Sequence, residues 1–306
     1  MPPKTDFRPL LHPRYWLSWI GLALLRLISF APLPVLWLVG YVLGGGLYYL
    51  HGARRHITVR NIESCFPALN RRAHRRMARQ HFRALGQTIL AMGIAYWGST
   101  RRLECLVRCV GRGHYDEALA QGRPVILLAP HFTGIDIGGI YLSRERPIIS
   151  MYRRVKNQLF DEVLRRRRTR YGGQVVERRE GLKPIVKAMR QGMVFYYLPD
   201  QDPGRHNTVF VPFFGVPTAT LTALGRLARI TNALVVPCFT RQMSYGRGYE
   251  VTFKPALDNF PTADEVADTA RMNREIEQGV REMPAQYFWV HKRFKTRPLG
   301  EPDFYR

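Results

Sequence analysis

The N-terminal part of the chain is dominated by one long apolar stretch, from Tyr15 to Leu50. Only Arg26, Pro32 and Pro34 interrupt it. About 20 apolar helical residues cross the hydrocarbon core of a bilayer, so the stretch is long enough for one spanning helix. It lacks the small-residue cleavage site of a signal peptide. The pattern predicts a retained membrane anchor, either a single span or a shallow hairpin in one leaflet. A buried helical hairpin of a soluble protein is the alternative.

Basic residues flank this stretch on both sides and are denser on its C-terminal side. They are Lys4, Arg8 and Arg14 before it, and Arg54, Arg55, Arg60 and the Arg71–Arg79 cluster after it. Because an excess of Lys and Arg marks the cytoplasmic side of a membrane segment, we expect the main body of the protein in the cytoplasm.

Residues 70 to 97 have the period of an amphipathic helix that begins after Asn70. One face is apolar and the other is basic: Met77, Phe82, Leu85, Ile89 and Met92 on the first, Arg71, Arg72, Arg75, Arg76, Arg79 and Arg83 on the second. Such a helix either lies on an anionic membrane surface or presents an ordinary solvated arginine face.

After residue 105 the pattern changes to alternating strands and helices. The predicted strands are Val125–Ala129, Pro147–Tyr152, Gln174–Val176, Val194–Leu198, Leu234–Phe239 and Tyr249–Phe253. Helices are predicted near 134–144, 157–170, 181–191 and 220–231, with a last one from a Thr262/Glu265 capping box to about 282. This alternation predicts an α/β fold with a mixed, mainly parallel central sheet flanked by helices. We place a domain boundary near residue 100, between a membrane-anchoring and basic amphipathic region (1–100) and an α/β domain (101–306).

The strand predicted at Val125–Ala129 leads into the strongest candidate for a catalytic site. Pro130 ends it, and a helix follows whose first turn contains Asp136. His131 and Asp136 therefore lie at the carboxyl end of a core strand, where open α/β sheets bind their ligands. Such a histidine can act as a general base, and the carboxylate can fix its tautomer. A histidine that only caps the helix is the alternative.

Asp200 directly follows the strand predicted at Val194–Leu198, so we expect it at the same edge of the sheet. By composition, an aspartate that only stabilises a turn is as good an explanation. The run Arg165–Arg170 ends the helix predicted at 157–170. Cations there complement the helix dipole, but guanidinium groups beside a site also bind phosphates. Arg153 and Arg170 are further candidates for substrate binding.

The composition points to anionic partners, because the formal net charge is +24 and the pI is about 10.6. Nucleic acid, anionic lipid and an acidic carrier protein all fit that charge. Four cysteines give neither a disulfide framework nor a zinc motif, and we interpret them as reduced thiols. The sequence contains no glycine-rich phosphate loop, no dinucleotide fingerprint and no His-Glu-x-x-His motif.

Six separated segments resemble the bacterial lipid A late (secondary) acyltransferases of the glycerolipid acyltransferase superfamily, and the lauroyl-transferase branch most of all. They are Leu11-His-Pro-Arg-Tyr-Trp16, Arg60-Asn-Ile-Glu-Ser-Cys-Phe-Pro67, His131-Phe-Thr-Gly-Ile-Asp136, Tyr152-Arg153, Val209-Phe-Val-Pro-Phe-Phe214 and His291-Lys-Arg-Phe-Lys-Thr-Arg-Pro298. The resemblance covers essentially the whole chain. It implies a bacterial inner-membrane enzyme that moves an acyl group from acyl carrier protein to a hydroxyl of a 3-hydroxyacyl chain on a Kdo-bearing lipid A precursor.

The resemblance also implies roles for particular residues. His131 and Asp136 match the catalytic pair, while Asp200 and Arg168 match a functional aspartate and a functional arginine. For the reaction so implied, we expect backbone N–H groups at the N-terminus of the helix after Pro130, with Arg168 nearby, to stabilise the oxyanion. No metal or organic cofactor is implied, because the carrier delivers an activated thioester, and no nucleic acid is expected as a partner.

One departure from the lauroyl branch concerns residue 136, where that branch usually has Glu and this chain has Asp. The side chain is one methylene shorter, which leaves the acyl chain length and the acylated position open. Two alternative functions remain at this point. One is acylation of another glycolipid or a lysophospholipid, and the other is a non-catalytic basic protein that binds anionic lipid or nucleic acid.

Overall fold

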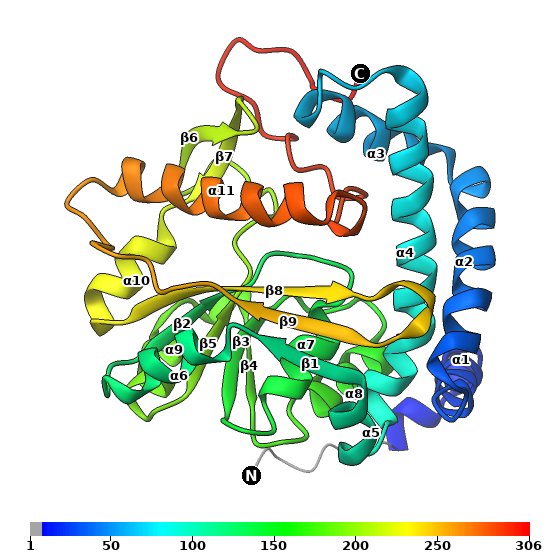
Figure 1. Ribbon diagram of the computed structural model, residues 1–306. Helices are drawn as coiled ribbons and strands as arrows, with labels where there is room; N and C mark the ends of the chain where they lie inside the picture. Colours follow the sequence, from blue (N-terminus) through cyan, green and yellow to red (C-terminus); the bar gives the residue numbers. More distant parts are fainter. Residues whose placement is uncertain (1–7) are drawn as a thin grey trace.

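A seven-stranded sheet forms the centre of the computed structural model, which describes residues 8–306 (Figure 1). Its strands, in spatial order, are β1 (Val107–Val110), β9 (Tyr249–Phe253), β8 (Leu234–Gln242), β2 (Val125–Leu128), β5 (Val194–Tyr197), β3 (Ile148–Tyr152) and β4 (Gln174–Glu177). All neighbours pair in parallel except β8 and β9, which pair antiparallel. The predicted fold class, a mixed and mainly parallel sheet flanked by helices, is therefore confirmed.

The middle of the sheet is buried on both faces, as the continuous apolar run of β2 requires. Side chains of β2 alternate between the two faces, so Val125 and Leu127 lie in one apolar cluster and Ile126 and Leu128 in the other. The first cluster includes residues of α5 (Thr100–Leu106), α6 (Arg112–Ala120), α7 (Ile135–Leu142) and α8 (Gln158–Arg168). The second includes residues of α9 (Lys183–Arg190), α10 (Ala223–Thr231) and α11 (Glu265–Glu282).

Three strands were not predicted: β1 and the separate antiparallel pair β6 (Thr208–Phe213) and β7 (Val216–Leu221). Because residues 216–221 pair with β6, the helix expected from 220 begins only at Ala223. The last helix ends at Glu282 as predicted, but its cap is Asp264, whose carboxylate accepts from the N–H groups of Val266 and Ala267. Short 3-10 turns complete the chain: η1 (Arg8–Leu11), η2 (Pro13–Tyr15), η3 (Arg178–Glu180), η4 (Ser244–Gly246) and η5 (Pro284–Gln286).

The apolar N-terminal stretch folds as two helices, α1 (Trp16–Ile28) and α2 (Leu33–Leu50). The break falls at Pro32 and Pro34, because proline lacks the N–H that continues a helix and clashes with the preceding turn. Within residues 8–306, α2 is the one helix long and apolar enough to cross a membrane, and 28% of that segment is buried in the protein. Helices α3 (Gly52–Cys65) and α4 (Arg71–Trp97) follow, and Asn70 caps α4 as predicted by accepting from the N–H of Ala73.

Helix α2 runs alongside α4 in backbone contact (Figure 1). A Cβ atom on Gly44 would lie 2.1 Å from the carbonyl oxygen of Phe82, and one on Gly86 would lie 2.2 Å from that of Gly40. Only glycine permits this approach. Arginines of α4 also lie over aromatic rings of α2: Arg83 over Tyr41, and Arg79 over Tyr48 and Tyr49.

The outer sides of α1 and α2 carry large apolar side chains that no element within residues 8–306 covers. Leu17 is 81% exposed, Phe30 75%, Leu27 68% and Val42 67%. On the inner side, these helices and α3 belong to the same body as the α/β region. The Asn61 side chain, for example, donates to the carbonyl oxygens of Trp289 and His291, at 2.7 and 2.8 Å. The boundary near residue 100 stays a prediction.

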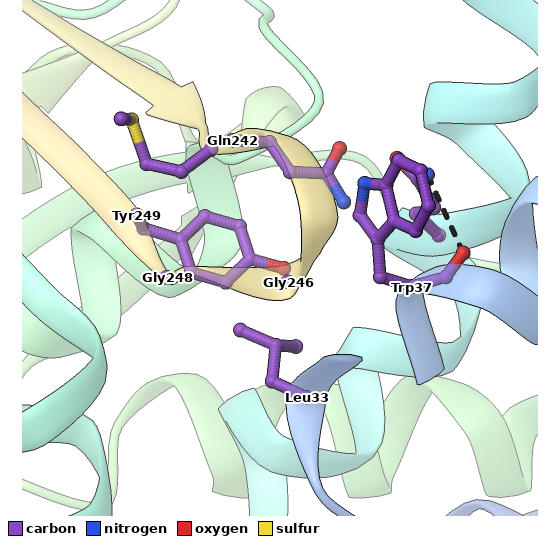
Figure 2. Close-up of a pocket in the computed structure, with 8 residues that line it drawn as sticks. Leu33, Trp37, Gln242, Gly246, Gly248 and Tyr249 are labelled. Carbon is purple, nitrogen blue, oxygen red and sulfur yellow. Dashed lines mark hydrogen bonds between the residues drawn. The ribbon is translucent and has the colours of Figure 1, made fainter. Parts of the chain in front are cut away.

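A small pocket lies between α2 and the turn that joins β8 to β9, lined by Leu33, Trp37, Gln242, Gly246 and Tyr249 among others (Figure 2). It has no room for a water molecule. The Gln87 side chain closes one side by donating to the carbonyl oxygen of Trp37, at 3.4 Å. None of the predicted site residues lines this pocket, which we interpret as packing between α2 and the sheet.

Candidate active site

His131 lies just beyond the carboxyl end of β2, as predicted. Ala129 still continues the sheet, because its N–H donates to the carbonyl oxygen of Tyr197, at 2.8 Å. Pro130 then ends the ladder, and the carbonyl oxygen of His131 accepts from the N–H of Phe288, at 3.0 Å. The imidazole is partly open to solvent, with 23% of its side-chain surface exposed.

Asp200 holds His131 through both of its carboxylate oxygens. Oδ1 lies 2.7 Å from Nδ1 of the ring, and Oδ2 accepts from the backbone N–H of His131 at 2.9 Å. The two residues meet because β5, which Asp200 follows, is the immediate neighbour of β2. The Asp200 side chain is only 1% exposed. Burial acts to raise the pKa of Asp200, but the charge and hydrogen bonds of His131 outweigh it, and the pKa is lowered.

This contact fixes the tautomer of His131. An ionised carboxylate only accepts, so the ring proton lies on Nδ1 and the Nε2 lone pair remains available. Nε2 has no hydrogen-bond partner among residues 8–306. A histidine held in this way by a buried carboxylate, with its second nitrogen free, has the arrangement of a general base.

Asp136 lies in the first turn of α7, where it binds Arg168 instead of His131. Its Oδ1 lies 2.9 Å from Nε and 2.8 Å from Nη2 of Arg168, the last residue of α8. The expected contact with His131 is thus replaced by one with Asp200, and a catalytic role for Asp136 stays a prediction. The charge of Asp136 raises the pKa of Arg168. Tyr96 lies beside the pair, and burial, with the charge of Asp136, raises the pKa of its hydroxyl.

Arg153 and Arg170, the further candidates for substrate binding, lie in different surroundings. Arg153 is exposed at the carboxyl end of β3, the strand next to β5. Arg170 donates from Nη1 to the carbonyl oxygens of Tyr96 and Gly98, at 3.2 and 2.9 Å, and so satisfies the end of α4. A substrate contact for either arginine stays a prediction.

The backbone N–H groups directly after Pro130 are already used inside the protein. That of His131 donates to Asp200, that of Phe132 to the carbonyl oxygen of Pro130, and that of Thr133 to the carbonyl oxygen of Gln286. These three groups are therefore not free to stabilise an oxyanion, and a role for backbone donors at the N-terminus of α7 stays a prediction.

A C-terminal segment, residues 287–296, fastens the loop that carries Asp200. The Tyr287 hydroxyl donates to the carbonyl oxygen of Asp200, and Nε2 of His291 accepts from the N–H of Asp202 at 2.9 Å. The Asp202 carboxylate in turn accepts from the N–H and hydroxyl of Thr296. His291 begins one of the segments that carry the family resemblance, and Asp202 lies two residues after Asp200. Local spacing gave neither a role, since 89 positions separate them.

The bacterial lipid A biosynthesis acyltransferase family matches residues 4–296, almost the entire chain. The chain belongs to this family. It is a lipid A late acyltransferase, and the site around His131 lies in an enzyme that transfers acyl groups.

Individual relatives are similar to this lipid A acyltransferase over their full lengths. The lipid A biosynthesis lauroyltransferase of Escherichia coli (strain K12) is 35% identical over 97% of both chains. The palmitoleoyltransferase of the same organism is 34% identical over 99% of both chains, and its myristoyltransferase is 32% identical over 96% of this chain and 92% of its own. These near-equal identities confirm the family but do not select among the three acyl chains.

Proposed function

We propose that this lipid A acyltransferase moves a fatty acyl group, lauroyl or similar, from acyl carrier protein to a hydroxyl of a 3-hydroxyacyl chain on a Kdo-bearing lipid A precursor. The observation that carries the proposal is the His131–Asp200 pair at the carboxyl end of β2, in a chain that matches the family almost from end to end. Membership of the family supports acyl transfer as the reaction, and the His131–Asp200 pair supports His131 as its general base.

His131 acts through Nε2. It takes the proton from the acceptor hydroxyl, and the hydroxyl oxygen attacks the thioester carbonyl carbon. The carbon–sulfur bond then breaks, and the sulfur receives the proton that His131 had taken, so the carrier leaves as a thiol. Asp200 keeps the ring in the required tautomer and balances the imidazolium that forms between the two steps. General base catalysis of this kind contributes about 10²–10⁴ in rate.

Basic side chains around the site support an acidic carrier as the donor. Exposed residues follow the carboxyl ends of β3 and β4, on the same half of the sheet as Asp200: Arg153, Arg154, Lys156, Arg178 and Arg179. Arg178 also contacts the loop after Asp200, since its Nη2 donates to the carbonyl oxygen of Pro203 at 3.4 Å. A positive rim of this kind attracts an acidic protein at long range.

The exposed apolar sides of α1 and α2 support attachment to the bacterial inner membrane, with the α/β region in the cytoplasm. Leu17, Leu27 and Phe30 are well exposed on α1 and just after it, and α2 continues the apolar surface. Large apolar surfaces without a covering element mark contact with a membrane or a partner. Arginines of α4 beside the tyrosines of α2 suit the interface between lipid and water.

Transfer of a labelled acyl group tests the function directly. Full-length wild-type protein in detergent, or in membranes, is mixed with acyl carrier thioester and lipid A precursor, and the acylated lipid is measured. His131→Ala should lower kcat by about 10²–10⁴, with unchanged thermal unfolding and little change in acceptor affinity. A near-normal rate in His131→Ala would exclude this mechanism. Mass spectrometry of lipid A from cells in which this chain replaces the host enzyme then identifies the acyl chain and its position.

A further inference from the structure

His291 is fixed at the candidate site by the same two chain segments that hold His131. The N–H of Phe288 donates to the carbonyl oxygen of His131, and the carbonyl oxygen of Phe288 accepts from the N–H of His291, at 3.0 and 3.2 Å. On the other side, Asp200 binds the His131 ring and Asp202 binds the His291 ring. Asp200 and Asp202 are two positions apart in the sequence, so their Cα atoms are at most about 7 Å apart. The two imidazoles therefore flank one short loop.

The hydrogen bond from Asp202 selects the same tautomer in His291 as Asp200 selects in His131, but it leaves the other ring nitrogen free. A backbone N–H donates to Nε2, so Nε2 carries a lone pair and the ring proton of the neutral imidazole lies on Nδ1. Nδ1 has no partner in the part of the chain that the structure describes. Burial lowers the pKa of His291 to about 4, so the ring is neutral at physiological pH.

The reaction needs a donor, and the first three residues after Pro130 do not supply one. Attack on the thioester puts negative charge on the carbonyl oxygen, and preorganised donors aimed at that oxygen are a major source of rate enhancement. The N–H groups of His131, Phe132 and Thr133 are already committed. We propose that His291 is a second catalytic residue, whose Nδ1–H donates to the thioester carbonyl oxygen as it becomes an oxyanion.

This inference rests on the proposed function, and it adds one balanced step to it. As the acceptor oxygen bonds to the carbonyl carbon, the π electron pair moves onto the carbonyl oxygen, and the Nδ1–H of His291 stabilises it. When the carbon–sulfur bond breaks, that pair re-forms the carbonyl and the carrier leaves as a thiol. His291 keeps its proton throughout, because a neutral imidazole is a weak acid and a good donor.

Two substitutions separate this role from a structural one. His291→Gln places an amide near Nε2, so it can still accept from the N–H of Asp202 but has no donor at the Nδ1 position. His291→Asn places its amide near Nδ1, so it keeps a donor there but loses the acceptor for Asp202. If His291 only supports the loop, His291→Gln should lose less kcat than His291→Asn. If His291 stabilises the oxyanion, His291→Asn should lose less kcat than His291→Gln.

The measurement is steady-state transfer from acyl carrier thioester by the full-length enzyme, with thermal unfolding of each variant as the check on folding. We expect His291→Gln to lower kcat by about 10²–10³, the usual effect of removing one oxyanion donor, with both KM values within about threefold and Tm unchanged. His291→Asn should lower Tm and keep kcat within about tenfold of the wild type.

A wild-type rate in His291→Gln, or losses of kcat that follow the losses of Tm in both variants, would overturn the role of His291. Failure of the proposed function is recognised separately, because the wild-type chain itself would then not transfer the acyl group. If one variant does not fold, the other still decides, since the two predictions for kcat are opposite.

Discussion

Nδ1 of His131 lies 2.7 Å from Oδ1 of Asp200, a residue 69 positions later that follows the neighbouring strand. The carboxylate that fixes the base thus comes from β5, not from the helix after β2. Asp200 also accepts from the backbone N–H of His131, so it holds the position of the ring as well as its tautomer. The buried carboxylate and the partly exposed imidazole form one unit.

Replacing Asp200 with Asn should therefore impair catalysis more than binding. An amide can donate to Nδ1 and favour the wrong tautomer, and it cannot balance the imidazolium. We expect kcat to fall by up to roughly 10⁴, with KM for the acceptor nearly unchanged. Asp136→Asn is the matched control, measured in the same transfer assay. If Asp136→Asn loses about 10⁴ in kcat while Asp200→Asn stays within about tenfold of the wild type, Asp136 rather than Asp200 is the partner of His131.

The arginine run at the end of α8 allows a second comparison, between neighbours with different partners. Arg168 binds Asp136 beside the site, whereas Arg166 binds Glu162 one turn back on the same helix. We expect Arg168→Ala to lower kcat/KM at least about tenfold, or about 1.4 kcal/mol, because it leaves the Asp136 carboxylate without its partner. Arg166→Ala should stay within about threefold, since Glu162 keeps its ion pair with Arg165 and an i,i+4 pair contributes only about 0.2–0.5 kcal/mol. Equal effects on kcat/KM in the two variants would show that the arginines only stabilise the C-terminal end of α8.

The sequence predicted which residues end the strands, but not which of them meet. His131 and Asp200 each follow a continuous apolar run, so their place at the carboxyl edge could be read from the pattern. Their contact depends on β5 lying next to β2, and the order of strands in a sheet leaves no local trace in the sequence. The His-x4-Asp spacing suggested a nearer partner for His131. In the structure Asp136 is instead taken by Arg168, which comes from a different helix.

In the N-terminal region too, the sequence predicted the elements but not how they pack. The apolar stretch and its prolines predicted helices, but composition does not say which side of each helix faces protein. That side is set by glycines, since Gly40, Gly44 and Gly86 bring the backbones of α2 and α4 together. It follows that the larger side chains on the other side of α2 are left exposed.

Exposed apolar side chains on α1 and just after it predict how the protein attaches to a membrane. Leu17, Leu27 and Phe30 are each more than two-thirds exposed, so replacing all three with Glu should leave the fold intact. Each substitution removes about 1.5–3 kcal/mol of apolar burial in lipid and adds a charge. We expect the triple variant to leave vesicles of anionic lipid at high salt, measured by flotation. Leu299→Glu, at an 89% exposed position near the C-terminus, is the control and should float like the wild type. Full flotation of the triple variant at high salt would exclude this surface as the anchor.

The buried His81 on α4 predicts how stability depends on pH. Its side chain is fully buried, Nδ1 lies 3.0 Å from the carbonyl oxygen of Ala285, and burial lowers its pKa to about 4. An unfolded histidine titrates near 6.5, so between pH 6.5 and 4 the unfolded chain binds a proton that the folded chain does not. The contribution of His81 to the free energy of unfolding is thus fully present above about pH 6.5. It is lost as the pH falls, at up to about 1.4 kcal/mol per pH unit.

His81→Asn removes that titration and keeps an amide donor for the Ala285 carbonyl oxygen. The free energy of unfolding, from urea titrations at pH 4.5 to 7.5, should then fall less steeply with decreasing pH than in the wild type, by up to about one proton. The remaining slope includes His291, whose pKa is also lowered to about 4. His206→Asn, at an exposed position, is the control for the substitution itself. Parallel curves for His81→Asn and the wild type would mean that the folded protein protonates His81 as easily as the unfolded chain does, and that its burial carries no such cost.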